Sequence, residues 1–364
     1  MLEGSEKKLL GSVLSLARKV CDRIGRKVKL MEVCGTHTMV IAKSGLKTVF
    51  ADSLELISGP GCPVCVTDQK DIDKMILYSR LQNITICTFG DMIKVPGSFS
   101  SLEIERAYGA KVEIFYSPNE ALMYAMAYPQ REAVFVGIGF ETTIPLVAYC
   151  ILEAKKRGVK NFSVLSLHKI LPPALRVLLD DPDLSIDGLI LPGHVSTITG
   201  RKAFDFIGRD YGIPSCISGF EPQDIIEAIG IILLQILKNR PEVEIGYRRV
   251  VKENGNLTAQ EIIRQVFEPC DAKWRGFGEI PGSGLLIKKE FSGFDALKKF
   301  SLPEVNSESQ KSEKSGCICG DIIKGKKTPL DCQLFSSVCN PSRPFGPCMV
   351  SQEGACAAYY HYGV

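Results

Sequence analysis

The chain has 364 residues, 45% of them hydrophobic and 23% charged, with a net charge of +3, which is ordinary for a water-soluble globular protein of two or three domains. Its basic residues form no patch interleaved with aromatic ones, and its longest apolar segment, 225–237, is shorter than the about 20 residues that span a bilayer. We therefore expect no nucleic acid partner and no membrane segment, and the absence of a signal-peptide pattern at the N-terminus predicts a cytoplasmic protein.

Apolar spacing predicts an opening amphipathic helix over residues 5–24, followed by short apolar strands that alternate with helices. The predicted strands are 28–33, 54–57, 83–88, 111–116, 133–139, 162–168, 188–191, 214–217 and 285–287. The predicted helices among them are 36–42, 68–81, 119–127, 144–156 and 221–237. This alternation predicts α/β structure with parallel sheets, in which ligands gather outside the carboxyl ends of the strands.

The tripeptide Gly-Phe-Glu occurs at 139–141 and again at 219–221, each time at a predicted strand-to-helix corner. We interpret this echo as a weak sign of two α/β units. The expected architecture is two parallel-sheet α/β domains facing a cleft, with a small irregular cysteine-rich C-terminal region for an iron–sulfur cluster. The expected boundaries are 1–130, 131–300 and 301–364, and the third part begins with a Ser-, Glu- and Lys-rich linker.

The chain contains 14 cysteines, and this is its main anomaly, because structural disulfides are generally reduced in the cytosol. Metal or redox chemistry is therefore the leading explanation. Buried cysteine behaves as a small hydrophobic residue, and isolated cysteines are expected to be core or surface filler. These are Cys21, Cys87, Cys150, Cys216 and Cys270.

Two thiol motifs lie at predicted strand ends. Cys34 precedes a helix start, where exposed N–H groups and the helix dipole would favour its thiolate as a nucleophile or metal ligand. His37 would share a helical face with Cys34 as ligand, base or hydrogen-bond partner, although a lone histidine more often only caps a turn. Cys62 and Cys65 have the C-x-x-C spacing of a redox dithiol. The four residues together also fit a Cys₃His zinc site, and both interpretations stay open at this point.

Six further cysteines crowd the C-terminal tail, where almost no hydrophobic periodicity surrounds them. They are Cys317, Cys319, Cys332, Cys339, Cys348 and Cys356. A segment that cannot build a hydrophobic core needs another source of stability, and four thiolates bound to one inorganic centre would provide it. The spacings of 13, 7 and 17 residues that follow Cys319, leaving out Cys348, favour an iron–sulfur cluster over the paired knuckles of a zinc site. Two of the six are then spectators or redox relays.

Other polar residues at predicted strand ends could line the cleft. They are Asp91, Glu141, His168, His194 and Glu221. Each alone is more readily explained as a helix cap or a structural hydrogen-bonding group. The glycine-containing segments at 137–142 and 281–288 match neither a dinucleotide fingerprint nor a phosphate loop, so we expect no nucleotide.

Six motifs, in order along nearly the whole chain, resemble the hydrogenase maturation protein HypD family. They are Cys-Gly-Thr-His-Thr at 34–38, Gly-Pro-Gly-Cys-Pro-Val-Cys at 59–65, Phe-Gly-Asp-Met at 89–92, Gly-Phe-Glu-Thr-Thr at 139–143, Pro-Gly-His-Val at 192–195 and Cys-Met-Val-Ser-Gln-Glu-Gly-Ala-Cys at 348–356. Long ordered motifs of this kind are far more specific than a lone C-x-x-C.

The resemblance implies an assembly scaffold with electron-transfer activity, on which the Fe(CN)₂CO group of [NiFe]-hydrogenases is built. It implies a [4Fe-4S] cluster in the C-terminal region. The implied partners are a small HypC-type chaperone that shares the iron, a HypE-type protein that supplies the cyanide groups and, indirectly, the hydrogenase large subunit.

The resemblance also implies roles for individual residues. Cys34 would be the iron-ligating thiol with His37 beside it, and Glu353 a functional acid. The dithiol of Cys62 and Cys65 would complete the metal site within reach of the iron. The implied cluster ligands are Cys332, Cys339, Cys356 and one of Cys317 and Cys319. Cys348 is left without a role.

A second hypothesis, from another class, is a stand-alone thiol–disulfide oxidoreductase whose tail is only a structural metal staple. Both hypotheses use Cys62 and Cys65 as a redox pair. They differ in whether iron with cyanide and carbonyl ligands binds at Cys34, because only the assembly scaffold needs such a centre.

Overall fold

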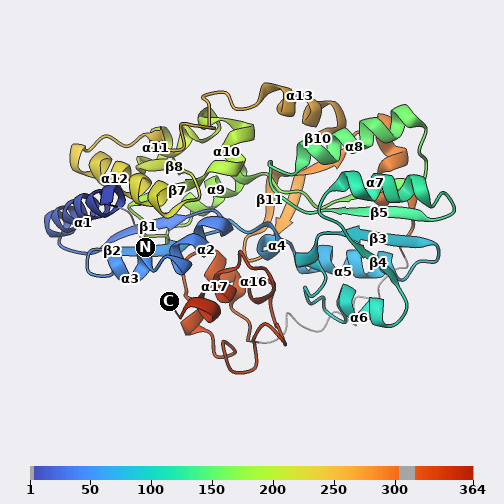
Figure 1. Ribbon diagram of the computed structural model, residues 1–364, viewed down its shortest axis with the longest axis horizontal. Coiled ribbons are helices and arrows are strands. Elements are labelled where there is room, and N and C mark those ends of the chain that lie inside the picture. The colour runs from blue at the N-terminus through green and yellow to red at the C-terminus, as the bar shows by residue number, and fades with distance from the viewer. Residues whose placement is uncertain (1–3, 303–315, 364) are drawn as a thin grey trace.

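The structure is a computed structural model that describes residues 4–302 and 316–363 (Figure 1). The expected linker lies almost wholly outside these described residues. Within them, no helix is long and apolar enough to cross a membrane.

The strands and helices follow the alternation that the sequence predicts. The strands are β1 (Val28–Glu32), β2 (Leu54–Ser58), β3 (Ile84–Thr88), β4 (Lys111–Ile114), β5 (Glu132–Gly137), β6 (Phe162–Ser166), β7 (Gly188–Pro192), β8 (Ser215–Ser218), β9 (Val243–Ile245), β10 (Phe267–Trp274) and β11 (Gly278–Ile287). The longer α-helices are α1 (Gly4–Ile24), α2 (Gly35–Lys43), α5 (Gln69–Ser79), α7 (Pro118–Ala127), α8 (Ile144–Arg157), α9 (Leu171–Leu179), α12 (Pro222–Lys238), α13 (Leu257–Val266) and α17 (Ala355–Tyr362). The shorter ones are α3 (Leu46–Phe50), α4 (Pro63–Val66), α6 (Leu102–Ala107), α10 (Gly193–Thr199), α11 (Phe206–Tyr211), α14 (Ala296–Lys299), α15 (Cys319–Ile323) and α16 (Pro347–Val350). The 3₁₀ turns are η1 (Gly90–Met92), η2 (Arg201–Phe204), η3 (Lys289–Phe294) and η5 (Pro329–Asp331).

Two parallel sheets and one antiparallel hairpin form the framework. One sheet has five strands in the order β2-β1-β7-β8-β9, and the other has four in the order β4-β3-β5-β6. All pairings within these two sheets are parallel, which confirms the predicted α/β class. The hairpin of β10 and β11 is antiparallel and lies between the two sheets in Figure 1.

The sheets do not divide the chain where the sequence analysis places its boundary. The five-stranded sheet takes β1 and β2 from the first part of the chain and β7 to β9 from a later part, while β3 to β6 form the other sheet. The boundary expected after residue 130 falls between β4 and β5, which belong to the same sheet. The reason is that periodicity reveals strands but not their partners, and here a whole sheet is inserted between β2 and β7.

Alternating side chains of the strands pack on opposite faces, as the period of two requires. Leu30 on β1 belongs to an apolar cluster with α1 and α12, whereas its neighbour Met31 belongs to a larger cluster on the other face. On β5, Val134 joins this larger cluster and Phe135 joins a third. The larger cluster contains residues of both sheets, so a continuous apolar core connects them.

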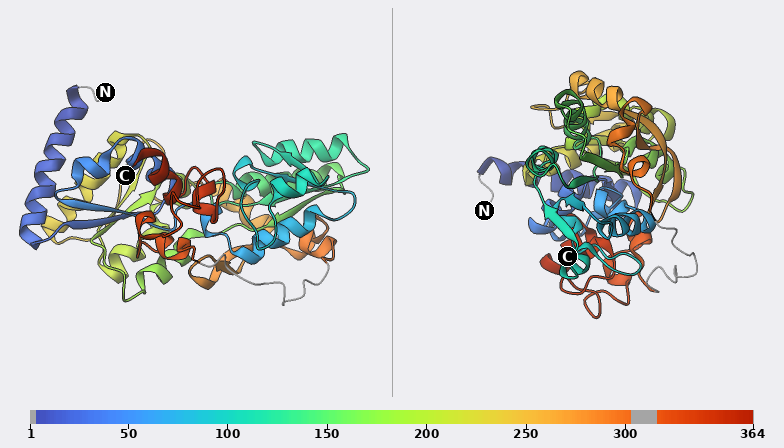
Figure 2. Two further views of the ribbon diagram at one scale, coloured as in Figure 1. Left: turned by 90° about the horizontal axis from the view of Figure 1, so that it is seen from below. Right: turned by 90° about the vertical axis from the view of Figure 1, so that its right-hand side faces the viewer.

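The C-terminal segment from residue 316 docks against the rest of the protein instead of folding alone. Ile322, Ile323 and Met349 are buried in the core cluster that the two sheets share. Helix α17 packs on α2, and α15 and α16 pack on α4. Figure 2 shows the segment lying across the middle of the elongated molecule. This docking places the tail cysteines next to the motifs at the ends of β1 and β2.

Candidate functional site at the strand ends

The ends of five strands from both sheets surround a cavity of about 270 Å³. Its lining includes Cys34 after β1, Gly61 after β2, Asp91 after β3, Thr142 after β5 and His194 after β7. Glu353 from the C-terminal segment lines the cavity too. The position agrees with the rule that parallel α/β sheets bind ligands outside the carboxyl ends of their strands.

Cys34 is the N-cap residue of α2 and has an extended backbone, with a φ angle of −152°. Its N–H donates to Oε2 of Glu32 at 3.0 Å, and the Glu32 carboxylate also accepts from the hydroxyl of Thr38. Burial raises the pKa of Cys34 to about 12, although N–H groups of the helix start point at its sulfur. The expectation of a favoured thiolate is therefore wrong for the protein without metal, because desolvation outweighs the helix start.

Glu32 is a buried acid that the sequence analysis did not single out. Burial raises its pKa to about 8, so it holds a proton at neutral pH. The sequence gives one sign of this acid, because an ionisable residue inside the predicted apolar strand before Cys34 is unusual.

His37 does not line the cavity that contains Cys34. Its ring Nε2 lies 2.9 Å from the carbonyl oxygen of Gly219, so Nε2 carries the proton and donates. Burial lowers the pKa of His37 to about 4, and Nδ1 is buried without a hydrogen-bond partner. Cys34 is not helical, so the two side chains do not share a helical face. In this arrangement His37 ties α2 to the corner between β8 and α12.

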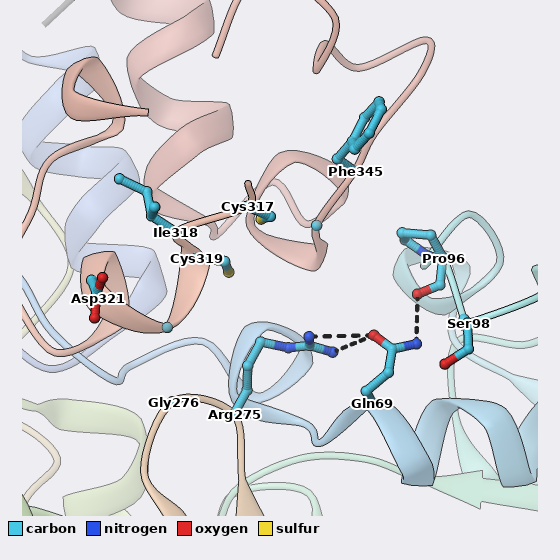
Figure 3. A pocket seen from close by; sticks show the side chains of 13 residues that line it. Gln69, Pro96, Ser98, Arg275, Gly276, Cys317, Ile318, Cys319, Asp321 and Phe345 are labelled. Carbon is cyan, nitrogen blue, oxygen red and sulfur yellow. Dashed lines mark hydrogen bonds between the residues drawn. The ribbon is translucent and has the colours of Figure 1, made fainter. Parts of the chain in front are cut away.

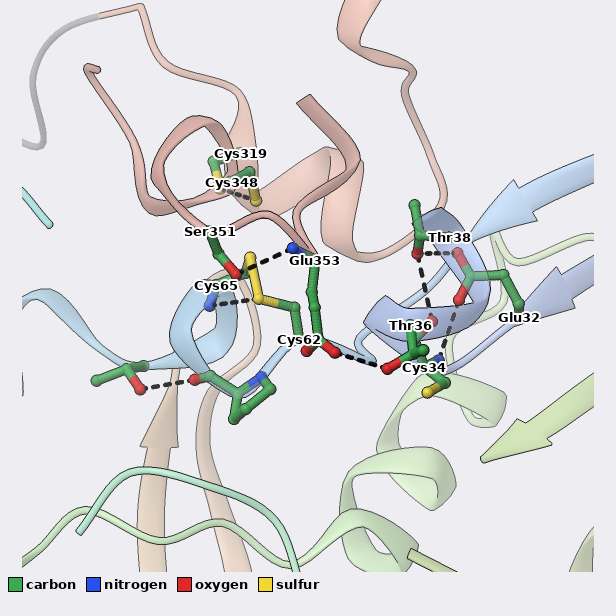
Figure 4. Close-up of a disulfide and its surroundings, with 12 residues drawn as sticks. Glu32, Cys34, Thr36, Thr38, Cys62, Cys65, Cys319, Cys348, Ser351 and Glu353 are labelled. Atoms are coloured by element: carbon green, nitrogen blue, oxygen red, sulfur yellow. Dashed lines mark hydrogen bonds between the residues drawn. A yellow bond between two sulfur atoms is a disulfide. The ribbon is translucent and has the colours of Figure 1, made fainter. Parts of the chain in front are cut away.

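Cys62 and Cys65 form a disulfide at the start of α4 (Figure 4). Both are buried, and the N–H of Cys65 donates to the sulfur of Cys62 at 3.2 Å. Because these sulfurs are bonded to each other, the metal site expected from Cys34, Cys62 and Cys65 is not preformed, and the Cys₃His arrangement is not supported either.

The loop before the disulfide touches the Cys34 segment directly. The N–H of Gly35 donates to the carbonyl of Gly61 at 3.0 Å. A Cβ atom added to Gly61 would lie 2.0 Å from the nitrogen of Cys34. Only glycine permits this approach, so the Gly-Pro-Gly sequence fixes the disulfide against the cysteine of the other motif.

Glu353 connects the C-terminal segment to both motifs. Its Oε1 accepts from the hydroxyl of Thr36 at 2.6 Å, and burial raises its pKa. It lines the cavity that contains Cys34 and also a smaller space that contains Cys62, Cys65 and Cys348. Figure 4 shows the side chain running from the disulfide toward Thr36. Glu353 thus borders the spaces that contain both cysteine motifs.

The tail cysteines converge, and Cys348 is among them. Its sulfur lies 2.8 Å from that of Cys319. Burial raises the pKa of Cys356, and the neighbouring thiols of Cys319, Cys317, Cys339 and Cys332 raise it further. Spacing alone gives Cys348 no role, because it cannot distinguish one thiol of six from another.

The remaining strand-end residues separate into two groups. Asp91 and His194 line the cavity and are exposed at its edge, and the ring of His194 stacks on Phe220 with centroids 3.7 Å apart. Glu141 accepts from the N–H of Leu171, His168 contacts Ser166, and Glu221 caps α12, and none of these three lines the cavity.

Among the filler cysteines, Cys87, Cys150 and Cys216 are buried in apolar clusters, as predicted. Cys21 and Cys270 are partly exposed. None of the five lines the cavity at the strand ends.

The fold and this site define a class: an α/β protein in which a buried cysteine, a disulfide and a set of tail thiols meet at the ends of parallel strands. The profile of the HypD family, described as the hydrogenase formation hypA family, matches residues 8–363. The chain belongs to this family.

Curated relatives support the assignment over at least 90% of their length. A hydrogenase maturation factor HypD of Rhodobacter capsulatus is 42% identical over 358 residues, which are 98% of this chain and 95% of the relative. The factor of that name from Escherichia coli is 42% identical over 93% of this chain and 90% of its own length. A putative hydrogenase expression/formation protein of Methanocaldococcus jannaschii is 40% identical over 100% of this chain and 99% of its own.

Proposed function

We propose that this protein is a hydrogenase maturation factor that holds an iron centre at Cys34 while cyanide and carbonyl ligands are attached to it. The observation that carries the proposal is the convergence of Cys34, the Cys62–Cys65 disulfide and the tail thiol of Cys348 around Glu353. Iron here is the substrate under assembly. Cyanide and carbon monoxide bind low-spin Fe(II), and a thiolate is a suitable soft co-ligand.

Binding of iron at Cys34 requires the loss of a thiol proton. Because burial raises the pKa of Cys34 to about 12, the metal must displace that proton, and iron binding is expected to release it. Burial also raises the pKa of Glu353, which lines the same cavity, so this carboxyl group binds a proton more readily than an exposed one.

The cavity is open to a partner at the edge formed by Asp91 and His194, which are exposed. We propose a HypC-type chaperone, which shares the iron, and a HypE-type protein, which supplies cyanide, as the partners that approach there. The hydrogenase large subunit would receive the product indirectly. These partners come from the family resemblance.

The tail thiols are chemically suited to a [4Fe-4S] cluster. Thiols that lie close together in a buried segment fit a cluster bound by thiolates, although in the described part of the chain no three ligand side chains are already grouped as a metal site. Because Cys319 is paired with Cys348, we assign the ligands to Cys317, Cys332, Cys339 and Cys356. Such a cluster supplies single electrons when it is bound.

The paired thiols of Cys319 and Cys348 can pass reducing equivalents to the buried disulfide. Cys348 lies in the same small space as Cys62 and Cys65. A thiolate of the pair attacks one sulfur of the disulfide, and the second thiol resolves the mixed disulfide. The products are a Cys319–Cys348 disulfide and two thiols at Cys62 and Cys65, so electrons and protons balance without another reactant.

The competing function is a stand-alone thiol–disulfide oxidoreductase. Its redox pair would have to reach a disulfide of another protein, whereas the side chains of Cys62 and Cys65 are 5% and 2% exposed. The same burial suits a pair that reacts with groups inside the protein.

Infrared spectroscopy separates the two functions. The protein would be co-purified anaerobically with its small chaperone, and the spectrum recorded between about 1900 and 2150 cm⁻¹, where cyanide and carbonyl ligands on iron absorb. The assembly function predicts such bands on protein that also contains iron. Iron-containing protein without these bands would contradict it.

A further inference from the structure

A second cavity, of about 260 Å³, lies on the other side of the tail thiols (Figure 3). Cys317 and Cys319 line it on one side, and Arg275 and Gln69 on the other. Nothing in the proposed iron chemistry uses this cavity. Arg275, at the turn between β10 and β11, is the charged residue of this cavity that faces the thiols.

The backbone around Arg275 contacts both α4, which carries the disulfide, and the cysteine-rich tail. Its N–H donates to the carbonyl of Val66, the last residue of the helix that carries the disulfide, at 2.8 Å. The preceding Trp274 is fully buried. A Cβ on the following Gly276 would lie 2.8 Å from the Cα of Gly320 in the tail. The turn is therefore held in contact with α4 and with the cysteine-rich segment at once.

The guanidinium of Arg275 has only a neutral partner. Its two terminal nitrogens both donate to Oε1 of Gln69 at 3.3 Å, and its Nε is buried without an acceptor. Within residues 4–302 and 316–363 it forms no ion pair. Asp321 also lines the cavity but is exposed at its rim. A half-buried cation without a counter-ion is costly unless an anion compensates it.

The thiols across the cavity are within electrostatic reach of this cation. Cys317 and Cys319 line the same cavity as Arg275, and the turn that carries Arg275 touches Gly320 of the tail. When the tail thiols act as thiolate ligands, they provide the negative charge that the guanidinium lacks. No other arginine or lysine lines this cavity in the described part of the chain.

We propose that Arg275 is a positioning residue that balances the negative charge of the thiolate-bound cluster. Its positive charge raises the reduction potential of the cluster. This inference rests on the cluster of the proposed function. A cation beside an anionic centre in a partly desolvated site favours the state with the additional electron, and net charge near a cluster is one of the factors that set its potential. Gln69 holds the guanidinium in place.

The test is a redox titration of the anaerobically reconstituted full-length protein, followed by electron paramagnetic resonance. Arg275→Gln removes the charge and keeps a polar side chain, whereas Arg275→Lys keeps the charge. Arg106→Gln, on an exposed position of α6, is the matched control. We expect Arg275→Gln to shift the potential to a more negative value, and the other two variants to stay close to the unmodified protein, at equal iron and sulfide per chain.

The other outcomes also decide the question. Assembly of a cluster in Arg275→Lys but not in Arg275→Gln would support a requirement for the charge. An unchanged potential in Arg275→Gln, an equal shift in Arg106→Gln, or loss of the cluster from both Arg275 variants while they remain folded by circular dichroism would overturn the inference. If the unmodified protein itself binds no iron and sulfide, the proposed cluster fails, and Arg275 loses its role with it.

Discussion

Burial sets the protonation of the ionisable groups near the strand ends. The pKa of Cys34 is raised to about 12 and that of Glu141 to about 7, and in each case desolvation is the largest cause. Conversely, burial lowers the pKa of His37 to about 4. At neutral pH the thiol of Cys34 and the ring of His37 are therefore uncharged in the metal-free protein, and the binding of a metal cation is the event that removes the thiol proton.

Replacement of Cys34 tests the iron site at the level of one atom. Cys34→Ala should lose the infrared bands of iron-bound cyanide and carbon monoxide, because the thiolate ligand is gone. It should keep the visible absorbance of the tail cluster, since no tail cysteine is changed. Cys21→Ala, at a partly exposed position of α1, is the control and should keep both signals. Unchanged bands in Cys34→Ala would refute the assignment.

Glu141 gives a prediction for the pH dependence of stability. Its Oε1 accepts from the N–H of Leu171 at 3.0 Å, and its Oε2 is buried without a partner. Its folded-state pKa of about 7 lies above the ordinary glutamate value of 4.5. The folded protein thus binds the extra proton, and the stability that Glu141 contributes is present below pH 4.5 and lost as pH rises through about 7.

The amide variant Glu141→Gln keeps the acceptor for Leu171 but does not ionise. We expect its stability relative to the unmodified protein to increase between pH 5 and pH 8.5, by a few kcal/mol at most, on the order of 1.4 kcal/mol per pKa unit. Denaturant unfolding of the metal-free proteins at several pH values measures this difference. A difference that does not change with pH would show that Glu141 titrates normally.

At the scale of elements, the sequence predicts what depends on local pattern. The opening helix and the strands from β1 to β8 lie where apolar runs place them, and the corners at Cys34, Gly61, Asp91 and His194 line one cavity because parallel strands end at the same edge. Helix α13 was not predicted although it is amphipathic, and strand β10 was not predicted because few of its residues are buried and they form no apolar run. The orientation of His37 could not be predicted either, since it depends on the distant Gly219.

The contact between the first two motifs can be tested through Gly61. In Gly61→Ala the new methyl group would meet the backbone nitrogen of Cys34 at 2.0 Å, and backbone cannot yield as a side chain can. We expect a loss of about 2 kcal/mol or more in the free energy of unfolding. The control is Gly11→Ala in α1, where nothing lies within 4 Å of the added Cβ. It should stabilise the protein by up to about 1 kcal/mol, because alanine favours helix. Equal effects of the two substitutions would contradict the close approach.

At the scale of the molecule, the site depends on segments that are far apart in sequence. The strands β3 to β6 of one sheet lie, along the chain, between β2 and β7 of the other sheet, and the tail packs on α2 and α4. Period and composition identify a cysteine-rich tail but do not say which thiols it brings to which motif, because tertiary packing sets that contact. The clearest example of this limit is Cys348. It had no role by spacing, yet it lies beside Cys319 and in the space around the disulfide.

The route from the tail to the disulfide makes Cys348 testable. Reconstituted protein would be reduced anaerobically with dithionite, quenched in acid and alkylated, and the thiol state of Cys62 and Cys65 read by mass spectrometry. In Cys348→Ser we expect the tail cluster to bleach as in the unmodified protein while Cys62 and Cys65 remain a disulfide. Exchange needs two thiols at the tail, and burial of the disulfide hinders direct reduction. Cys270→Ser, at a partly exposed position of β10, should behave as the unmodified protein. Normal reduction of the disulfide in Cys348→Ser would mean that electrons reach it without the tail pair, and the three cysteine sets would then not form one path.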